Sequence, residues 1–338
     1  MKFIFSSIND ISTNYVIDWL ICLNQKFQRY NGVKINESEF DFNALSMHFS
    51  FGDNYDQSEI FMNSQDLLKD VDSIWFRRPY FGVDDLYNKP VEGSYVIPTF
   101  KFNQDLQSHY SILKSHTINS LLSRCNVVLG SSSIIGLNKP NALLLAKECG
   151  LNIPNTLISN SYDDVERFFE NNNNKIICKA LHESFAYFPQ NSINGIIQFT
   201  ALIDDLSDIP RTFGYSLFQE LIEKMYELRI VYLDGAFYPM AIFSQGHEKT
   251  SIDFRRTDQE TQVRMVPYNI EDQLKNKIDK LLKKIGLNMA SIDLVKSTNG
   301  KIYFLEINPV GQYDFVSRSC NYYLDLKIAN YLTHGKNK

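Results

Sequence analysis

The segment from Ser291 to Tyr313 constrains the fold of this chain more than any other part of the sequence. Two runs of strand-forming residues flank Asn299-Gly300, a dipeptide that is the strongest short-range signal for a two-residue hairpin turn. If Thr298 pairs with Lys301, the register of the hairpin follows. The opposed residues are then Val295 and Phe304, Leu294 and Leu305, and Asp293 and Glu306.

The expected pairing brings two carboxylates together across the hairpin. Opposed Cβ atoms lie about 5 Å apart, and like charges at that distance destabilise a sheet, so a fold that keeps Asp293 opposite Glu306 needs a cation between them. Side chains alternate along a strand, which places Asn308 on the face of Glu306. This oxygen-only set suits Mg²⁺ carrying the phosphates of a nucleotide. The alternative is a solvated hairpin with scattered acids, which the apolar residues of both strands disfavour.

The string LEINPVGQ, which follows Asp293 across the turn, resembles the metal-binding end of the ATP-grasp ligases. In that family, an acid on one strand and an E-x-N motif on the next hold the magnesium ions of ATP. The resemblance implies that Asp293, Glu306 and Asn308 are metal ligands. It also implies that ATP and Mg²⁺ are the cofactors.

Composition sets limits on the class of protein. With 338 residues, 44% of them hydrophobic and 22% charged, the chain is typical of a soluble globular protein of two or three domains. A net charge of −5 gives no general attraction to nucleic acid. The longest apolar run, Ala142 to Ala146, is too short to span a membrane. Five widely spaced cysteines without a C-x-x-C motif argue against disulfides or zinc and favour a reducing cytoplasm.

The first part of the chain alternates strands with helices, which predicts an open α/β domain ending near residue 125. The expected elements are a strand at 2–6, a helix capped by Ser12 with apolar positions as far as Phe27, a strand at 71–76, a helix at 102–123 and a strand at 126–129. Further helices are expected from Pro140 to Gly150, after Ser161, and up to Gly286.

The resemblance implies an α/β (α+β) ATP-grasp fold in three parts. The N-terminal open α/β pre-ATP-grasp domain, which contributes to substrate binding, spans 1–125. A central ATP-grasp lid domain spans 126–218. A C-terminal antiparallel-sheet domain with the magnesium site spans 219–338.

Two lysines are candidates for binding phosphate. Lys139 precedes a Pro-initiated helix in a segment that resembles the K-x6-A-x3-G-[ILV]-x2-P-x-T signature of the ATP-grasp nucleotide domain. Lys179 interrupts an apolar strand, and a lysine of this kind is often at a sheet edge. The resemblance instead implies that Lys179 is the second phosphate lysine.

The segment LFQELIEKMYELRIVYLDG is typical of a strand, a short link and a second strand that turns at Asp234-Gly235. The resemblance implies that Glu220 lies near the adenine amino group and that Glu227 lies at the ribose hydroxyls. The backbone of Leu221, Ile222 and Glu223 would read the adenine edge. Arg229 is expected to share the face of Glu227 and to reach a phosphate. Taken alone, each of these acids is more often a solvated surface charge.

Three segments narrow the resemblance: SIWFRRP at 73–79, DFRR with the later RMVPY, and the tail GQYDFVSRSCNYYLDLKIANYL. They are similar to the ATP-grasp peptide maturases of graspetide (microviridin-like) pathways, and most similar to the grasp-with-spasm subgroup. Such enzymes phosphorylate an Asp or Glu side chain of a ribosomally made precursor peptide with a leader and a core. A Ser or Thr hydroxyl, or a Lys amine, then closes an ester or amide macrocycle. The span 182–194 lacks the glycines that many relatives carry in a flap over the phosphates.

Arginines are the candidates for handling the substrate. Arg77 and Arg78 leave a buried strand at its carboxyl end, where open α/β sheets place ligands, and are expected to bind substrate. A second set is expected to act on the acceptor or the acyl phosphate, namely Arg229, Arg255, Arg256 and Arg264. His182 and His247 could assist proton transfer, although histidines of this kind are more often structural.

Two other functions stay open. One is an ATP-grasp carboxylate–amine ligase that adds an amino acid to a protein or a small molecule. The other is a nucleotide-binding module without catalysis, which the complete set of metal ligands disfavours. The ring pattern, the choice between ester and amide, and the oligomeric state, including a homodimer, are not determined by the sequence. No nucleic acid or membrane is expected as a partner.

Overall fold

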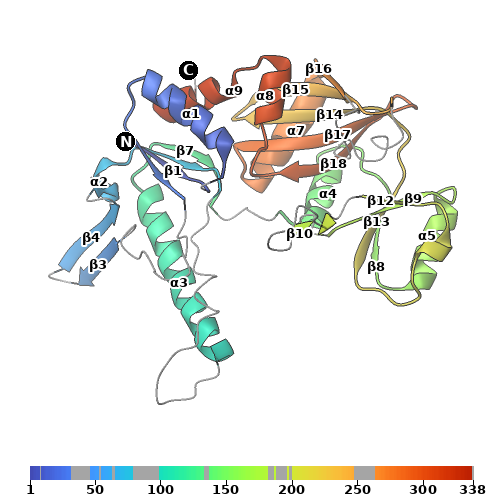
Figure 1. Cartoon of the computed structure of the whole chain (residues 1–338), viewed down its shortest axis with the longest axis horizontal. Helices are drawn as coiled ribbons and strands as arrows, with labels where there is room; N and C mark the ends of the chain where they lie inside the picture. The colour runs from blue at the N-terminus through green and yellow to red at the C-terminus, as the bar shows by residue number, and fades with distance from the viewer. Residues whose placement is uncertain are drawn as a thin grey trace. The chain divides into compact units, whose positions relative to one another are not determined.

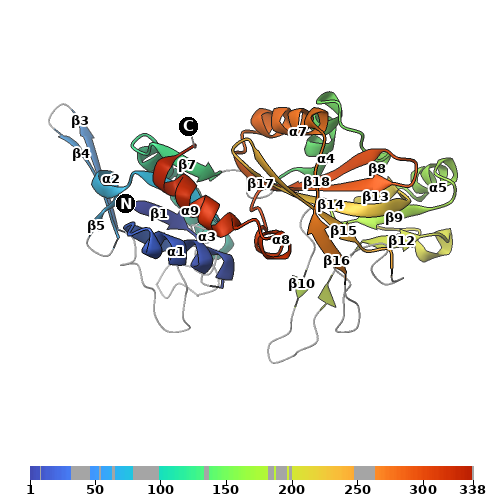
Figure 2. The same cartoon turned by 90° about the horizontal axis from the view of Figure 1, so that it is seen from above.

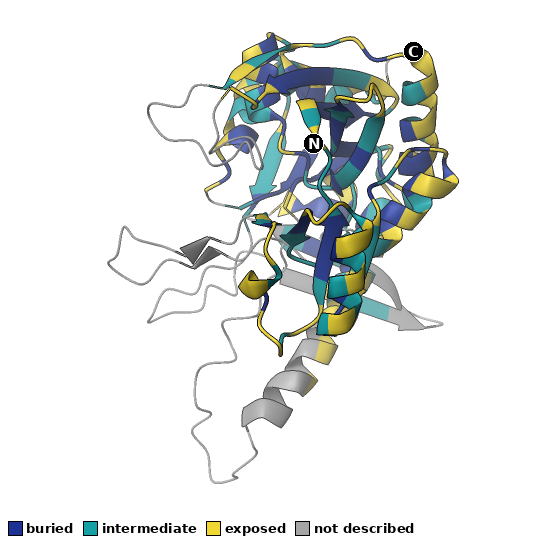
Figure 3. Ribbon diagram, turned by 90° about the vertical axis from the view of Figure 1, so that its right-hand side faces the viewer, coloured by how far each residue is buried: buried dark blue, intermediate teal, exposed yellow. Residues whose placement is uncertain are grey.

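The computed structural model describes residues 1–7, 9–31, 46–52, 55–62, 65–78, 99–132, 137–181, 186–187, 196–197, 200–246 and 263–336. The chain divides into two compact units (Figure 1). The first unit combines Met1–Ile135 with Tyr323–Lys338, and the second is Gly136–Tyr322. Strands of both units carry most of the buried residues, and the outer faces of the helices are exposed (Figure 3).

The first unit is built on a parallel sheet with the strand order β2-β1-β6-β7. Its strands are β1 (Lys2–Phe5), β2 (Phe27–Tyr30), β6 (Ser73–Phe76) and β7 (Val127–Gly130). Helix α1 (Ile11–Cys22) joins β1 to β2, and α3 (Thr99–Leu122) lies between β6 and β7 in the chain. The connections therefore leave β1 and β6 in opposite directions, which makes the gap between these two strands a topological switch point.

Both faces of this sheet are covered. Phe3, Phe5, Ile74 and Phe76 pack with Ile118 and Leu121 of α3 on one face. The C-terminal helix α9 (Leu324–His334) packs against α1, β6 and β7, and Figure 1 shows α1 and α9 together on the side away from α3. The indole Nε1 of Trp19 donates a hydrogen bond to Asp325 over 2.5 Å. The first unit thus extends past residue 125 to include β7 and takes its last helix from the end of the chain.

The start of the first unit differs from the expected elements in two ways. Helix α1 is preceded by Asp10 as its N-cap, and the hydroxyl of Ser12 donates to Asp10 at 2.5 Å instead of capping the helix. The helix stops at Cys22, and Asn24 adopts a φ of 53°. Phe27 therefore begins β2 and is not a helix residue, so the expected helix was too long.

An antiparallel sheet with the strand order β3-β4-β5 lies between β2 and β6 in the chain. It consists of β3 (Ser46–Gly52), β4 (Tyr55–Met62) and β5 (Gln65–Asp66), followed by the short helix α2 (Leu67–Asp70). Ile60, Leu67 and Leu68 belong to the same core as the parallel sheet. None of these strands was expected from the sequence.

The second unit contains an antiparallel four-stranded sheet with the strand order β12-β9-β13-β8. The strands are β8 (Thr156–Ser159), β9 (Ile176–Lys179), β12 (Ala201–Ile203) and β13 (Ser216–Glu220). Helix α5 (Tyr162–Asn171) packs on this sheet through Val165 and Phe169, and a 3-10 turn, η3 (Leu206–Asp208), follows β12. Ser161 accepts the Asp164 N–H at the start of α5, which confirms the predicted cap. A separate pair, β10 (Ala186–Tyr187) and β11 (Ile196–Ile197), is also antiparallel.

The second sheet of this unit is antiparallel, with the strand order β16-β15-β14-β17-β18 (Figure 2). Its strands are β14 (Lys224–Leu233), β15 (Ala236–Phe243), β16 (Arg264–Pro267), β17 (Met289–Ser297) and β18 (Ile302–Asn308). Helices α4 (Lys139–Glu148), α7 (Asp272–Ile285) and α8 (Asp314–Cys320) complete the unit. Tyr232 donates to Asp279 of α7 over 2.7 Å, and α8 contacts β15 and β16. Helix α7 ends at Gly286 with a φ of 85°, as predicted.

The hairpin of β17 and β18 pairs Asp293 with Glu306, as predicted, but its other expected pairs are wrong. The turn is not a two-residue one, because Ser297 donates to Lys301 O at 2.9 Å and leaves three residues between them. A bulge after Asp293 then shifts the register, so Leu294 faces Phe304 and Val295 faces Tyr303. Leu305 is the extra residue on β18. Within the described ranges, no helix is long and apolar enough to cross a membrane.

Candidate functional site

The paired acids of β17 and β18 lie among protein cations. Arg229 of β14 stands opposite Asp293 in the sheet, and its Nη1 lies 2.7 and 2.5 Å from the two carboxylate oxygens. Oε2 of Glu306 lies 3.6 Å from Nζ of Lys139. Side chains of the protein therefore place a positive charge beside each of the two carboxylates, and the metal between them stays a prediction.

Burial governs the ionisation of this cluster. It raises the pKa of Asp293 to about 6, with Arg229 opposing the shift and Glu306 adding to it. Burial lowers the pKa of Lys179, and the attraction of Glu306 opposes that shift. A charged group in such surroundings interacts strongly with its neighbours, because little water is present to screen it.

Lys139 reaches Glu306 from the first turn of α4. Asn138 caps this helix by accepting the Asn141 N–H at 3.0 Å, and Pro140 occupies the first turn, where its missing N–H costs nothing. The ammonium group of Lys139 also donates to the backbone oxygen of Ala180 at 3.3 Å. Ala180 directly follows Lys179, so the two predicted phosphate lysines come together from a helix and a strand.

Lys179 ends β9, which has β12 on one side and β13 on the other. The structure therefore does not support the alternative that this lysine lies on an edge strand. The loop after α4 is fixed to the hairpin of β17 and β18 by Asn152, whose side-chain Nδ2 donates to Ile302 O at 3.0 Å. The backbone carbonyl of Asn152 accepts the Phe304 N–H at 2.8 Å. These bonds hold the lysines and the acids of the cluster in one unit.

Arg229 is itself held in place. It is buried, its Nη2 donates to Oε1 of Gln312 over 3.4 Å, and its guanidinium carbon lies 5.5 Å from the ring centroid of Phe315. Its Nε is buried without a hydrogen-bond partner among the residues that the structure describes. Arg229 is thus a fixed guanidinium on the same face of the sheet as Asp293.

Two carboxylates flank the link between β13 and β14: Glu220 ends β13, and Glu227 lies in the first part of β14. The backbone N–H and Nδ2 of Asn155 donate to the two carboxylate oxygens of Glu220 at 2.9 and 3.1 Å. At the other end, Lys224 Nζ lies 2.6 Å from Oε1 of Glu227, which also accepts from Ser244 Oγ at 2.9 Å. Both predicted nucleoside acids are therefore oriented by specific partners and are not loose surface charges.

The backbone of the link is partly occupied. The Leu221 N–H donates to Lys175 O at 3.4 Å, and the Glu223 carbonyl accepts from Thr298 N at 2.9 Å and from Ser297 Oγ at 3.0 Å. Ile222 makes no backbone hydrogen bond within the part of the chain that the structure describes. Of the three residues predicted to read adenine, Ile222 has the backbone groups best placed to do so.

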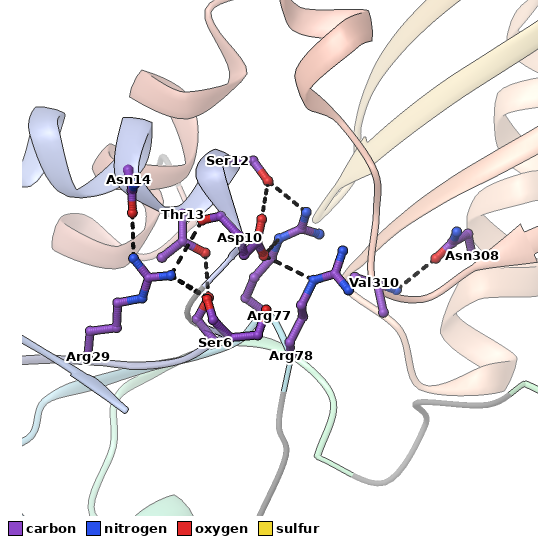
Figure 4. A network of polar contacts seen from close by, with 11 residues as sticks. Ser6, Asp10, Ser12, Thr13, Asn14, Arg29, Arg77, Arg78, Asn308 and Val310 are labelled. Carbon is purple, nitrogen blue, oxygen red and sulfur yellow. Dashed lines mark hydrogen bonds and ion pairs between the residues drawn. The ribbon is translucent and has the colours of Figure 1, made fainter. Parts of the chain in front are cut away.

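The predicted metal ligands provide oxygen donors on one face of the hairpin. Asn308 stands opposite Ser291, and its Oδ1 accepts the Val310 N–H at 3.2 Å, which fixes the amide (Figure 4). Ser291 Oγ is buried without a hydrogen-bond partner among the described residues, so this face of the hairpin has a further unsatisfied oxygen. Such a set fits a hard cation such as Mg²⁺. The described residues contain no group of three or more His, Cys, Asp or Glu arranged to hold a metal, and the predicted set has two carboxylates and one amide.

The predicted substrate arginines that the structure describes belong to two different units. Arg77 and Arg78 belong to the first unit, where both lie against Asp10 (Figure 4). Arg264 pairs with Phe243 on β15 and is exposed, with its guanidinium carbon 5.4 Å from that ring.

Arg264 also lies on the wrong face of its sheet to join the charged cluster. Ile242, next to Phe243, pairs with Glu227, and side chains alternate along a strand. Arg264 is therefore on the face opposite Glu227, Arg229 and Asp293. Arg255, Arg256, His182 and His247 lie outside the described residues.

Four residues of these networks were missed by sequence reasoning: Asp10, Asn155, Lys224 and Ser244. Each is a polar residue that no motif identifies, and each is recognised only by the partner that it contacts in the folded chain. Only Lys224 carried a local signal, since it is three residues before Glu227 in a strand. An irregularity between Lys224 and Tyr226 brings it to the carboxylate.

Comparison with family models and with curated protein sequences finds no match. Solved structures match along the whole chain. The macrocyclase MdnC from Microcystis aeruginosa MRC, bound with precursor peptide MdnA, is 23% identical with a TM-score of 0.71, covering 98% of this chain and 99% of that one. A RiPP-associated ATP-grasp ligase from Chryseobacterium gregarium, in complex with ADP and a leader and core peptide, is 20% identical with a TM-score of 0.76, covering 100% and 97%.

A more distant match is D-alanyl-alanine synthetase A from Vibrio cholerae, 14% identical with a TM-score of 0.51, covering 91% of this chain and 88% of that one. The fold of this chain is therefore the ATP-grasp fold. More particularly, it is the form of that fold found in the peptide macrocyclases, which match this chain from end to end.

Proposed function

We propose that this chain is an ATP-dependent, ADP-forming ligase that matures a ribosomally made precursor peptide. It would phosphorylate Asp or Glu side chains of the core and join them to Ser or Thr hydroxyls or Lys amines, forming macrocyclic esters or amides. The observation that carries this proposal is Asp293 facing Glu306 between Arg229 and Lys139. The same fold occurs in two solved peptide macrocyclases or ligases whose complexes contain precursor, or leader and core, peptides.

ATP and Mg²⁺ are the proposed cofactors. One similar structure, of the ligase PsnB, is a complex with a precursor variant, Mg and ADP. Here Asp293, Glu306 and Asn308 would hold the metal, which neutralises phosphate charge when it is bound. Lys139 and Lys179 lie beside Glu306 and would bind the phosphates.

The nucleoside would lie along the link between β13 and β14. Glu220, held by Asn155, would accept from the adenine amino group, and the backbone of Ile222 would read the adenine edge beside Leu221 and Glu223. Glu227, held by Lys224 and Ser244, would accept from the ribose hydroxyls. Glu227 shares the face of the sheet that carries Arg229.

The proposed chemistry needs charge neutralisation more than a nucleophilic side chain. Transfer of the γ-phosphoryl group from ATP to a peptide carboxylate yields ADP and an acyl phosphate, which has a good leaving group. A hydroxyl or amine then attacks the acyl carbon, a proton is released and phosphate leaves. The fixed guanidinium of Arg229 would stabilise charge that develops on the phosphoryl oxygens. Arg255 and Arg256 stay proposals for holding the acceptor, whereas Arg264 lies on the other face of its sheet.

The alternative is an ATP-grasp carboxylate–amine ligase that adds a free amino acid to a protein or a small molecule. The likeness to D-alanyl-alanine synthetase A favours it, but at a lower TM-score than the macrocyclases. The proposed partner is a precursor peptide, without nucleic acid or membrane, and a homodimer is compatible with the sequence. All five cysteines are free thiols, which supports a reducing cytoplasm.

Mass spectrometry of a reaction with ATP, Mg²⁺ and the peptide encoded by a neighbouring short reading frame tests this proposal. The expected products are ADP, phosphate and a peptide that has lost one water per link. A precursor whose Asp and Glu acceptors are changed to Asn and Gln should stay linear. Release of AMP, or addition of a free amino acid in place of internal water loss, would move the chain to the alternative class.

A further inference from the structure

The first unit has a polar cluster at the topological switch point of its parallel sheet. Strands β1 and β6 are neighbours, and their carboxyl ends lead into Ser6 and Ser7 on one side and into Arg77 and Arg78 on the other. Open α/β sheets bind ligands at this position, because the two connections diverge and leave a crevice outside the strand ends. The residues that gather here are therefore candidates for a binding site.

The end of β6 is bent so that two successive arginines meet one acid. The backbone N–H groups of Arg77 and Arg78 both donate to Phe5 O, each over 3.0 Å. In a regular strand, neighbouring side chains point to opposite faces. Here the Nε atoms of Arg77 and Arg78 lie 2.9 and 3.2 Å from the same Oδ2 of Asp10 (Figure 4).

Arg77 is enclosed by this arrangement. Its side chain is 2% exposed, and its Nη2 donates over 2.9 Å to Ser12 Oγ, which in turn donates to Oδ1 of Asp10 at 2.5 Å. Asp10 itself is buried. Asp10, Ser12 and Arg77 thus form a closed ring, and a ligand could reach Arg77 only after the ring had opened.

Arg78 differs from Arg77 in the way that matters for binding. Its side chain is 45% exposed, and only its Nε is engaged, by Asp10. Its two terminal nitrogens make no hydrogen bond to any residue that the structure describes. One edge of the guanidinium is anchored, and the edge formed by the terminal nitrogens points away from its anchor. A guanidinium held in this way loses little rotational freedom when it binds.

The local charge favours an anion. Three arginines surround the single carboxylate of Asp10, since Arg29 also lies here and donates over 2.5 Å to Ser7 O and to Asn14 Oδ1. With all of them ionised, three positive charges face one negative charge among the described residues of this cluster. The terminal edge of one planar guanidinium matches the two oxygens of a carboxylate in a bidentate pair.

We propose that Arg78 binds one Asp or Glu carboxylate of the peptide substrate, and that Asp10 and Arg77 are positioning residues that fix its guanidinium. Because the inference takes a peptide as substrate, it rests on the proposed function. It makes that function more specific by giving different roles to two arginines that the sequence does not distinguish. Arg78 contacts the substrate carboxylate, and Arg77 helps to hold Asp10, which fixes Arg78.

The test compares Arg78→Gln, Arg78→Lys and Asp10→Asn with the parent and with Arg124→Gln, an exposed arginine of the same unit. The first probe is N-acetyl-glutamate amide, and N-acetyl-glutamine amide is its neutral control. Binding of each compound is monitored by NMR of the arginine side chains, labelled with ¹⁵N. This probe requires no turnover. The glutamate compound alone should shift the Arg78 signals, and the shift should disappear in Arg78→Gln.

The second probe is the precursor peptide, titrated by calorimetry. Loss of one charged bidentate contact should weaken peptide binding about tenfold or more in Arg78→Gln, with a smaller loss in Arg78→Lys, which keeps the charge without the fork. Affinity for ATP should not change in either variant or in Arg124→Gln. Asp10→Asn should weaken peptide binding without weakening ATP binding, and its melting temperature shows how much of the effect is structural.

Equal responses of the parent and Arg78→Gln to both probes would overturn the inference, whether or not the parent cyclises the peptide. Equal shifts with the glutamate and glutamine compounds would overturn it too, since the site would then not read charge. If the parent binds the glutamate compound through Arg78 but never cyclises a peptide, the proposed function fails and the carboxylate site stands. If Arg77→Lys, but not Arg78→Lys, loses peptide binding, the roles of the two residues are reversed.

Discussion

Asp293 lies directly opposite Glu306 because two irregularities in their hairpin cancel. The turn has three residues between Ser297 and Lys301, with only Gly300, at a φ of 83°, in the left-handed region. That extra residue moves the register by one position, and the bulge at Leu305 moves it back before Glu306. Bulges commonly re-aim side chains near functional sites, and this one returns the second acid to the face that carries Arg229.

Glu306→Gln should abolish turnover without unfolding the protein. The amide relieves repulsion from Asp293 but removes a metal ligand and the partner of Lys139. The rate of ATP-dependent cyclisation should fall about a hundredfold or more, the scale expected when one preorganised electrostatic contact is lost. Rates measured at one magnesium concentration, with circular dichroism to check folding, test this expectation.

The matched control is Glu148→Gln, an exposed acid on α4 whose single ion pair among the described residues is with Lys284. It should cyclise at the parental rate. If Glu306→Gln also kept the parental rate, Glu306 could not be a metal ligand.

Lys179→Met should weaken nucleotide binding. Methionine keeps the packing of the lysine stem and deletes the charge that Glu306 attracts. The affinity for ATP should fall about tenfold, equivalent to about 1.4 kcal/mol. Calorimetry is the measurement, and Lys280→Met, an exposed lysine of α7, is the control. Unchanged nucleotide affinity in Lys179→Met would remove this residue from the phosphate site.

Trp19→Phe should destabilise the first unit. The indole of Trp19 on α1 donates to Asp325 on α9, which joins the beginning of the chain to its end. A hydrogen bond to a charged group contributes roughly 1.5–3 kcal/mol. Urea unfolding of Trp19→Phe, Asp325→Ala and the double variant gives the coupling energy of the pair. Additive effects in that cycle would show that the bond contributes nothing.

Local signals predicted the parts of the fold that local geometry determines. Asp234-Gly235 forms the expected tight turn because both residues adopt positive φ, at 43° and 97°. Asn299-Gly300 looks alike in sequence, but Asn299 is outside the left-handed region, so the turn takes another residue. The predicted pairing of Asp293 with Glu306 was thus correct for a reason that the sequence could not reveal.

The features that could not be predicted from the sequence depend on partners that are distant in the chain. Phe27 continues the apolar spacing of α1, so β2 was hidden until its pairing with β1 was known. Arg77 and Arg78 are identical residues at successive positions. Both contact Asp10, which is distant in the sequence, but Arg77 is buried and Arg78 is half-exposed. The sequence motif therefore indicated both arginines but could not distinguish their surroundings.

The stability of the first unit should depend on pH through Asp10. Burial of Asp10 on its own raises the pKa of its carboxyl, but Arg77, a hydrogen bond from Ser12, and Arg78 outweigh it, so the pKa is lowered from 3.8. The folded state therefore holds the ionised carboxylate more tightly than the unfolded chain does. Its contribution is complete above pH 3.8 and is lost as the pH falls through the lower, folded-state pKa.

Asp10→Asn should consequently lower the free energy of unfolding at pH 7 by about 3 kcal/mol, because it leaves Arg77 buried without its counter-ion. The difference from the parent should stay constant down to pH 5 and shrink below pH 4, because the unfolded parent then binds a proton at Asp10 that the folded parent does not yet bind. Urea unfolding at pH 7, 5 and 3.5 measures the difference, with the exposed Asp70→Asn as the control. A difference that stayed the same at pH 3.5, or that grew there, would mean that the Asp10 carboxylate is not the group that Arg77 and Arg78 stabilise.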